Sequence, residues 1–223
     1  MNSDDDIAAR LGRLDSCAVS DALDRLGLAG CVTGIAPQTS ARRIAGLVHT
    51  VRLVAKGAAA APAGPPRHLG TAAIEACRPG EIIAVEQRSG IDAACWGGIL
   101  SQGAKIKGVA GVIADGPVRD VDEARQIDFP VFARTATSRT ARDRIVEAAT
   151  DAPIRIGEAT VRPGDYAIAD ASGVVFIRAE DAGRVLEAAE AIAGREAAMT
   201  EALRHGKRIT EVMGADYEHM LKR

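Results

Sequence analysis

The stretch GVAGVIADGPVRD, residues 108–120, decides the fold of this sequence. It begins as a run of small apolar residues, and a run of this kind is typical of a strand that is covered on both faces of a sheet. We therefore expect a buried strand over 109–114 and a loop over 115–120, which opens on Asp-Gly and ends on Arg119 and Asp120. Ligands of open α/β sheets bind beyond the carboxyl ends of strands, so this loop is the natural place for chemistry.

Segments with helix and strand patterns alternate on both sides of this strand. A helix starts at the Ser-Asp-Asp-Asp cluster and runs to about Leu14, and a second begins near Ser20 and stops at Gly27. Downstream we expect a half-buried strand from Ile44, a loop over 58–70, helices over 71–77, 95–108 and 121–127, a strand over 129–134 and a long helix over 179–205. This order predicts an α/β core, and we expect residues 1–223 to form a single domain.

Composition excludes several classes of function. The 223 residues carry 28 basic and 30 acidic side chains, a net charge of only −2, which favours neither nucleic acid nor an anionic membrane as a partner. No apolar run reaches the roughly 18 residues of a membrane span, and no export leader is expected. The four cysteines, Cys17, Cys31, Cys77 and Cys95, lack CxxC spacing and are interpreted as reduced thiols of a cytoplasmic protein.

A second glycine-rich segment lies upstream of the Arg-Asp pair. Gly97-Gly98 opens a helix, and the backbone amides of Ile99 and Leu100 in its first turn can donate to a carboxylate. If that turn faces the loop, Arg119 can clamp the same carboxylate and Asp120 can hold a hard cation such as Mg²⁺. Taken singly, the glycines also fit a simple helix start, and the Arg-Asp pair also fits a helix cap with a surface salt bridge.

These segments together resemble the RraA-like family, which includes class II 4-hydroxy-4-methyl-2-oxoglutarate/4-carboxy-4-hydroxy-2-oxoadipate aldolases and the regulators of ribonuclease activity A. The central likeness is WGGILSQGAKIKGVAGVIADGPVRDVDEARQIDFPVFAR, residues 96–134, and SDALDRLG and RPGDYAIADASGVVFI match in the same order. The resemblance implies a three-layer β/β/α swivelling domain of the α/β class. It also implies assembly as a homotrimer, or a hexamer made of two trimers, with sites between subunits.

The family's site residues carry over by position. The resemblance implies that Arg119 binds a pyruvate carboxylate together with the amides of Ile99 and Leu100, and that Asp120 anchors Mg²⁺ or Mn²⁺. The family's aldolases have an aspartate, used in proton transfer, where this sequence has Gly98. A carboxylate from a neighbouring subunit's last helix also approaches the metal in the family, and Glu196 is the nearest match by spacing.

Together with the resemblance, these residues predict a metal-dependent lyase that acts on 2-oxo acids through a pyruvate enolate. Aldol cleavage and oxaloacetate decarboxylation share that enolate, and only the former must remove a hydroxyl proton, so Gly98 favours decarboxylation. The alternative is a non-catalytic regulator that binds a ribonuclease. The sequence has no HExxH zinc motif, no GxSxG nucleophile and no glycine-rich methyltransferase turn after an early strand. Trp96 fits a pocket wall and core packing about equally.

Overall fold

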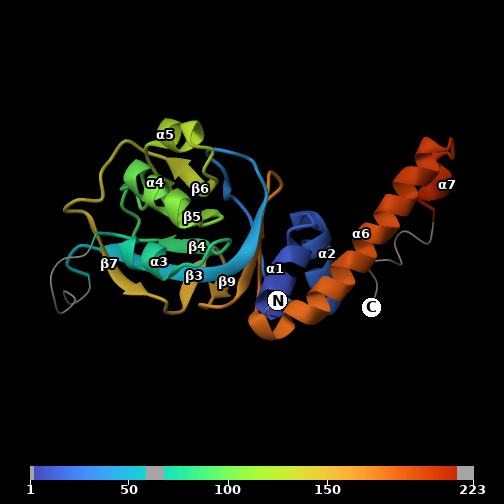
Figure 1. Cartoon of the computed structure of the whole chain (residues 1–223), viewed down its shortest axis with the longest axis horizontal. Coiled ribbons are helices and arrows are strands. Elements are labelled where there is room, and N and C mark those ends of the chain that lie inside the picture. Colours follow the sequence, from blue (N-terminus) through green and yellow to red (C-terminus); the bar gives the residue numbers. More distant parts are fainter. Residues whose placement is uncertain (1–2, 59–67, 215–223) are drawn as a thin grey trace.

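The computed structural model describes residues 3–58 and 68–214 and shows a curled mixed sheet with helices packed against it (Figure 1). Four parallel strands form its centre in the order β3 (Ile44–Ala55), β4 (Ile82–Gln87), β5 (Gly111–Val118) and β6 (Val131–Ala136). Antiparallel pairing continues the sheet beyond β3 through β10 (Tyr166–Ala169) and β11 (Val174–Ile177). The long strand β3 therefore joins a parallel half to an antiparallel half.

Shorter elements complete the sheet and cover it. The remaining strands are β1 (Cys31–Val32), β2 (Ala36–Pro37), β7 (Ile145–Thr150), β8 (Ile154–Ile156) and β9 (Ala159–Val161). The helices are α1 (Ser3–Leu11), α2 (Ser16–Leu26), α3 (Thr71–Ala76), α4 (Gly98–Lys107), α5 (Val121–Gln126), α6 (Ala182–Arg204) and α7 (Ile209–Val212).

Three apolar clusters define the layers. One lies between the parallel strands and helices α3, α4 and α5, and includes Trp96 and Phe129. A second fills the space inside the curled sheet, where β3, β4 and β5 face β8, β9, β10 and β11 around Phe132. The third lies between β10, β11 and helices α1, α2 and α6. The first two clusters give the expected three-layer β/β/α arrangement.

The predicted elements are largely confirmed, and the differences have local causes. Helix α2 begins at Ser16 rather than near Ser20, because the Asp15 side chain accepts a hydrogen bond from the Ala18 amide and caps the helix four residues earlier. It ends as predicted at Gly27, which adopts a left-handed conformation. Helix α1 stops at Leu11, short of the predicted Leu14. Most of the expected loop over 58–70 lies outside the described residues.

The prediction of a loop from Asp115 onward was wrong. Strand β5 continues to Val118, with a register shift against β6 between Ala114 and Pro117. The strand can include Asp115 because its carboxylate is buried against two donors, the Arg134 guanidinium at 2.6 Å and the Gly157 amide at 2.7 Å. Only Arg119 and Asp120 remain in the turn between β5 and α5.

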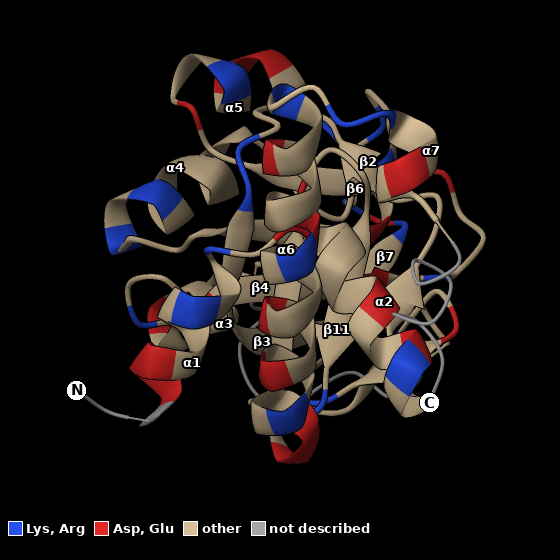
Figure 2. Ribbon diagram, turned by 90° about the vertical axis from the view of Figure 1, so that its right-hand side faces the viewer, with Lys and Arg blue, Asp and Glu red and all other residues tan. Residues whose placement is uncertain are grey.

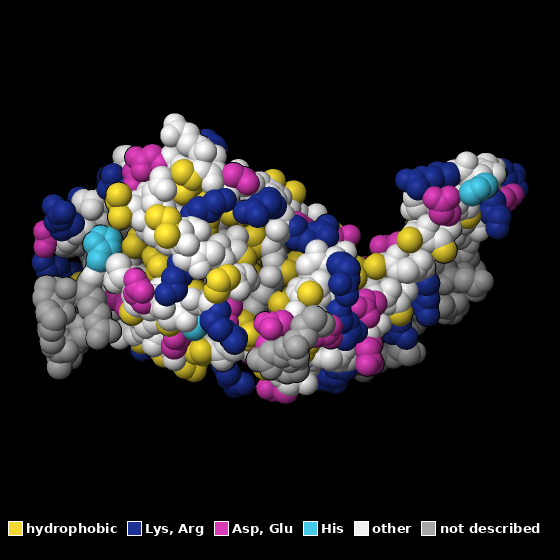
Figure 3. All heavy atoms as spheres, viewed as in Figure 1, with side chains coloured by type: hydrophobic (Ala, Val, Ile, Leu, Met, Phe, Trp, Pro, Cys, Tyr) yellow, Lys and Arg dark blue, Asp and Glu magenta, His cyan; other side chains and the backbone are white. Residues whose placement is uncertain are grey.

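Helix α6 starts against α1 and α2 and then extends away from the sheet, so that its end and α7 project from the body (Figure 1). The space-filling view shows a broad notch between this arm and the body (Figure 3). Acidic and basic side chains alternate along α6 and are mixed over the neighbouring helices, as the near-zero net charge predicts (Figure 2). Within the described ranges, none of the helices combines the length and apolar character needed to cross a bilayer.

Candidate functional site

The turn after β5 lies directly against the start of α4. The Cys95 amide donates to the Pro117 carbonyl at 2.9 Å, and the Arg119 amide donates to the Trp96 carbonyl at 3.0 Å. These two backbone hydrogen bonds hold the Gly97-Gly98 segment beside the Arg-Asp pair. The two motifs that the sequence places about twenty residues apart thus form one site at the carboxyl end of the parallel strands.

Arg119 and Asp120 contact each other at this site. The Arg119 Nε donates to Asp120 Oδ1 at 3.1 Å, while Asp120 Oδ2 accepts from the Gly98 amide at 2.9 Å. Asp120 has a φ of 55°, in the left-handed region that non-glycine residues seldom occupy. Backbone strain of this kind persists where the surrounding structure imposes it, and it is concentrated at functional sites. Here it turns the Asp120 carboxylate back toward α4.

The two glycines allow this close approach. A Cβ built on Gly97 would lie 2.9 Å from Asp120 Oδ2, closer than carbon tolerates, and in a tight contact of 3.2 Å with Arg119 Cγ. Gly98, Ile99 and Leu100 are the first residues of α4, so their amides have no partner in a preceding helical turn. Gly98 donates to Asp120, which leaves the Ile99 and Leu100 amides as donors for an anion.

A hollow of about 400 Å³ opens over Arg119 and Asp120 and is lined further by the first turn of α5 and by residues 136–138 at the end of β6. Both side chains of the pair are partly exposed to it, at 38% for Arg119 and 29% for Asp120. The donor set fits a hard divalent cation, because Mg²⁺ and Mn²⁺ bind oxygen and need only one or two protein carboxylates beside water and substrate. Asp120 is the carboxylate that could hold such a cation, and the adjacent Arg119 could pair with a bound carboxylate.

The other predicted residues lie as follows. Ile99 points outward and is 83% exposed, whereas the Leu100 side chain is buried, so both can contribute to a ligand site through their backbone. Trp96 is buried and its indole N–H donates to Ser101 Oγ at 3.0 Å, which favours the core interpretation. Glu196 lies on α6, away from the hollow of its own chain; partial burial and the carboxylates of Asp15 and Asp21 raise its pKa.

Sequence reasoning missed one acidic residue at this site. Glu123 lines the hollow, and its carboxylate lies over Gly98, so that a Cβ on that glycine would overlap Oε2 and lie 3.0 Å from Cδ. Its spacing in the sequence could have indicated this position. Glu123 follows Asp120 by three residues, which places the two on the same side of the first turn of α5.

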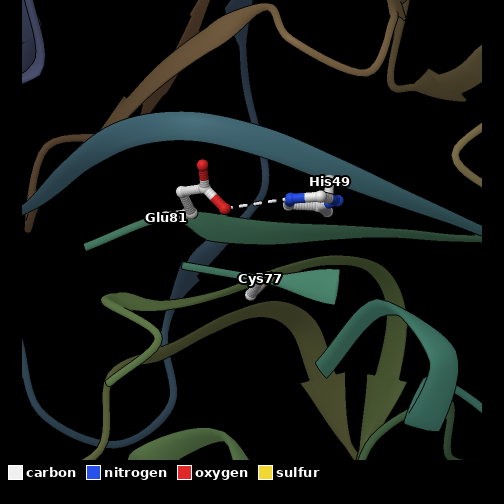
Figure 4. A group of neighbouring side chains, drawn as sticks. All are labelled: His49, Cys77 and Glu81. Atoms are coloured by element: carbon white, nitrogen blue, oxygen red, sulfur yellow. Dashed lines mark hydrogen bonds and ion pairs between the residues drawn. The ribbon is translucent and has the colours of Figure 1, made fainter. Parts of the chain in front are cut away.

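The chain carries a second polar cluster away from the hollow, formed by His49 on β3, Cys77 after α3 and Glu81 before β4 (Figure 4). Their ligand atoms lie within 4.8 Å of one another, a grouping that can hold a metal ion and that the sequence spacing did not predict. His49 is already shared between Glu81 and Asp151, at 3.0 Å from each, and Arg78 donates twice to Glu81. Burial, reinforced by Glu81 and Asp151, raises the pKa of Cys77 to about 12 and keeps its thiol protonated. We interpret this cluster as a structural link between β3 and β4.

Comparisons with known proteins agree with the fold and the motifs. A sequence model of the RraA-like family (Aldolase/RraA) matches residues 16–176. A relative from Halalkalibacterium halodurans, named "Putative 4-hydroxy-4-methyl-2-oxoglutarate aldolase", is 28% identical over 185 residues, which cover 83% of this chain and 82% of that protein. The match spans only part of two other curated relatives, 26% of the length of one and 60% of the length of another.

Solved structures give the same result. An uncharacterized protein from Pseudomonas syringae pv. tomato superimposes with a TM-score of 0.82 at 28% identity, covering 94% of this chain and 98% of the other. A second match is Streptomyces coelicolor RraAS2, described as an unusual member of the RNase ES inhibitor RraA protein family. It superimposes with a TM-score of 0.74 at 22% identity, covering 93% of this chain and 99% of the other, and at this identity it supports the fold alone. The matched segment contains the whole of α4, β5 and the Arg-Asp turn, and on these grounds the chain belongs to the RraA-like family.

Proposed function

We propose that this protein is a divalent-metal-dependent carbon-carbon lyase that acts on 2-oxo acids through a pyruvate enolate. The observation that carries the proposal is that Arg119 and Asp120 line one hollow and lie against the start of α4, where the Ile99 and Leu100 amides have no helical partner. A guanidinium and two amides suit a carboxylate, and the neighbouring aspartate suits a cation that chelates the same substrate. Relatives named as aldolases support this class of reaction.

Each group has a defined task in this proposal. Arg119 leaves Asp120 and forms a bidentate pair with the C1 carboxylate, which fixes the direction of the 2-oxo acid. The Ile99 and Leu100 amides donate to the same carboxylate from the N-terminus of α4. Asp120 holds Mg²⁺ or Mn²⁺, which supplies Lewis acidity at the 2-oxo oxygen when bound. The substrates that fit are oxaloacetate and 4-hydroxy-4-methyl-2-oxoglutarate or a similar diacid.

The test is a coupled pyruvate assay with each substrate, with Mg²⁺, with Mn²⁺ and with EDTA. We expect pyruvate above the uncatalysed rate only with a metal, and a loss of about 100-fold or more in Arg119→Ala and Asp120→Ala. Arg125→Ala and Asp128→Ala are matched controls: Arg125 is a nearby arginine on α5, and Asp128 shares the positive φ of Asp120, at 47°. A folded protein that turns over neither substrate would contradict the proposal and favour the non-catalytic regulator instead.

We also propose that the active form is a homotrimer or a hexamer of two trimers. Ile99 and Ile106 lie seven residues apart on α4, two helical turns, and are 83% and 85% exposed. Apolar side chains gather at the surface over this part of the molecule (Figure 3). Exposed apolar side chains on one helix face beside the site fit an interface, and a neighbouring subunit placed there can bring Glu196 toward the hollow. Light scattering on the purified protein measures the assembly.

A further inference from the structure

Carbon-carbon cleavage of a 4-hydroxy-2-oxo acid needs a group that takes the hydroxyl proton. Among the described residues that line the hollow, the carboxylates are Asp120, Asp122 and Glu123. Asp120 is assigned to the cation, and Asp122 is 88% exposed and paired with Arg125 at 2.9 Å. Glu123 has no ion-pair partner within the described ranges. It is the carboxylate in the hollow that is left free to accept a proton.

The position of Glu123 depends on Gly98. The glutamate reaches across from α5 and places its carboxylate over the Cα of Gly98, in space that any larger residue at position 98 would occupy. The same missing side chain lets the Asp120 carboxylate accept the Gly98 amide, and a Cβ there would lie only 3.1 Å from Asp120 Cβ. The glycine and the glutamate are therefore complementary: the helix α4 offers no carboxylate, and α5 places one at the same point.

We propose that Glu123 is the proton acceptor for aldol cleavage in this protein and that Gly98 is the residue that admits it. The inference rests on the proposed function. In the cleavage, the proton of the substrate's 4-hydroxyl passes to the Glu123 carboxylate and the C4–O bond becomes a carbonyl. The C3–C4 bond breaks with its electron pair on the pyruvate fragment, as the enolate. The proton then returns from Glu123 to C3, so that no further reactant is consumed.

The proposal makes the two reactions of the site separable. Decarboxylation of oxaloacetate has no hydroxyl proton to remove, whereas aldol cleavage does. Glu123→Gln keeps the size of the side chain and removes its basicity. We expect Glu123→Gln to lower kcat for aldol cleavage by about 100-fold or more and to change oxaloacetate decarboxylation by less than about threefold. Gly98→Ala displaces the glutamate but also brings a Cβ to 3.1 Å from Asp120 Cβ, so it should lower both reactions, aldol cleavage more strongly.

A second experiment tests whether a carboxylate placed on α4 restores aldol cleavage when Glu123 is removed. The double variant Gly98→Asp/Glu123→Ala moves the carboxylate from α5 to α4. The new aspartate then occupies the space over residue 98 that the Glu123 side chain fills in the native protein. It should recover aldol cleavage to within about tenfold of the native protein, whereas Glu123→Ala alone should not. Gly103→Ala is the control for a glycine substitution on α4, because its added Cβ would meet nothing within 4 Å.

Binding of oxalate, a stable analogue of the enolate, gives a readout that does not depend on turnover. In calorimetry with Mn²⁺, Glu123→Gln should bind oxalate within about twofold of the native protein, and Asp120→Asn should bind it at least about tenfold more weakly. If Glu123→Gln weakens oxalate binding as much as Asp120→Asn does, Glu123 acts on the cation and the proposal is overturned.

The two levels of inference fail in different ways. Equal losses in both reactions, or native aldol cleavage in Glu123→Gln, overturn the role of Glu123 and leave the lyase in place. Oxaloacetate decarboxylation without any aldol cleavage by the native protein also overturns it. If neither reaction occurs and oxalate with Mn²⁺ does not bind, the proposed function itself fails, and the role of Glu123 fails with it.

Discussion

The structural contacts of Asp120 are separable from its proposed role as a cation ligand, and substitutions that differ by a few atoms distinguish the two. Its carboxylate accepts from the Gly98 amide at 2.9 Å and pairs with Arg119 at 3.1 Å, and its backbone is left-handed. Asp120→Asn keeps an oxygen for the Gly98 amide and a residue that tolerates this conformation. Asp120→Ala removes the acceptor and places an unfavourable residue at a positive φ.

The structure gives the size of the difference. A hydrogen bond to a charged group contributes about 1.5 kcal/mol at the lower end, the end appropriate to a side chain that is 29% exposed. A left-handed alanine costs about 1–2 kcal/mol, and the exposed pair with Arg119 adds at most about 1 kcal/mol. We therefore expect Asp120→Ala to lower the free energy of unfolding by about 3 kcal/mol and Asp120→Asn by less than about 1 kcal/mol.

Urea unfolding followed by circular dichroism, in EDTA, measures both values, and pyruvate formation with Mg²⁺ measures activity. Both variants should lose activity, because an amide is a poor ligand for the cation, but only the alanine variant should lose stability. If the asparagine variant is as unstable as the alanine variant, the Gly98 amide and the backbone conformation do not contribute as argued. If the asparagine variant remains active, Asp120 is not the cation ligand.

Three further predictions concern neighbouring features. Gly97→Ala should lower activity at least about tenfold, since its Cβ would lie 2.9 Å from Asp120 Oδ2. Gly103→Ala should keep native activity, and pyruvate assays on the two variants in parallel measure the difference. Burial alone would raise the pKa of Asp170, but hydrogen bonds from Ser16 and Ser172 outweigh it and hold that pKa below the ordinary 3.8. The Asp170 carboxylate therefore stabilises the fold fully above its unfolded-state pKa, and this stabilisation is lost as pH falls through its folded-state pKa. We expect Asp170→Asn to lower the urea midpoint at neutral pH, and the difference from the native protein to shrink in acid. Ile106→Glu should reduce the mass measured by light scattering if α4 lies in the interface, and an unchanged assembly would exclude that face.

Local sequence signals predicted the elements that depend on local interactions. The stop of α2 at Gly27 and the helix that opens at Gly97-Gly98 follow from backbone preferences of the residues themselves. The apolar run predicted a buried strand, and β5 is one. The end of that strand could not be predicted, because Asp115 is accommodated by Arg134 and Gly157, which are distant in sequence.

The site shows the same division. The Arg-Asp pair and the glycine turn were recognisable as motifs, and the structure brings them together through the Arg119 amide and the Trp96 carbonyl. Glu123 was overlooked because its significance lies in a contact with Gly98, and contacts between helices are not readable from one sequence. The cluster of His49 and Glu81 was overlooked for the same reason, since adjacent parallel strands bring these residues together.

The mutual pairing of Arg119 and Asp120 has a consequence for selectivity. A simple anion that takes Arg119 leaves Asp120 without its cationic neighbour, and a cation that takes Asp120 alone leaves Arg119 unpartnered. A metal chelate of a 2-oxo acid satisfies both residues at once, since it presents a cation to one and a carboxylate to the other. Under the proposed function, metal and substrate then bind cooperatively, each raising the affinity for the other by the same factor. Under the same proposal, the Arg119–Asp120 ion pair would compete with phosphate, free carboxylates and bare cations for the site.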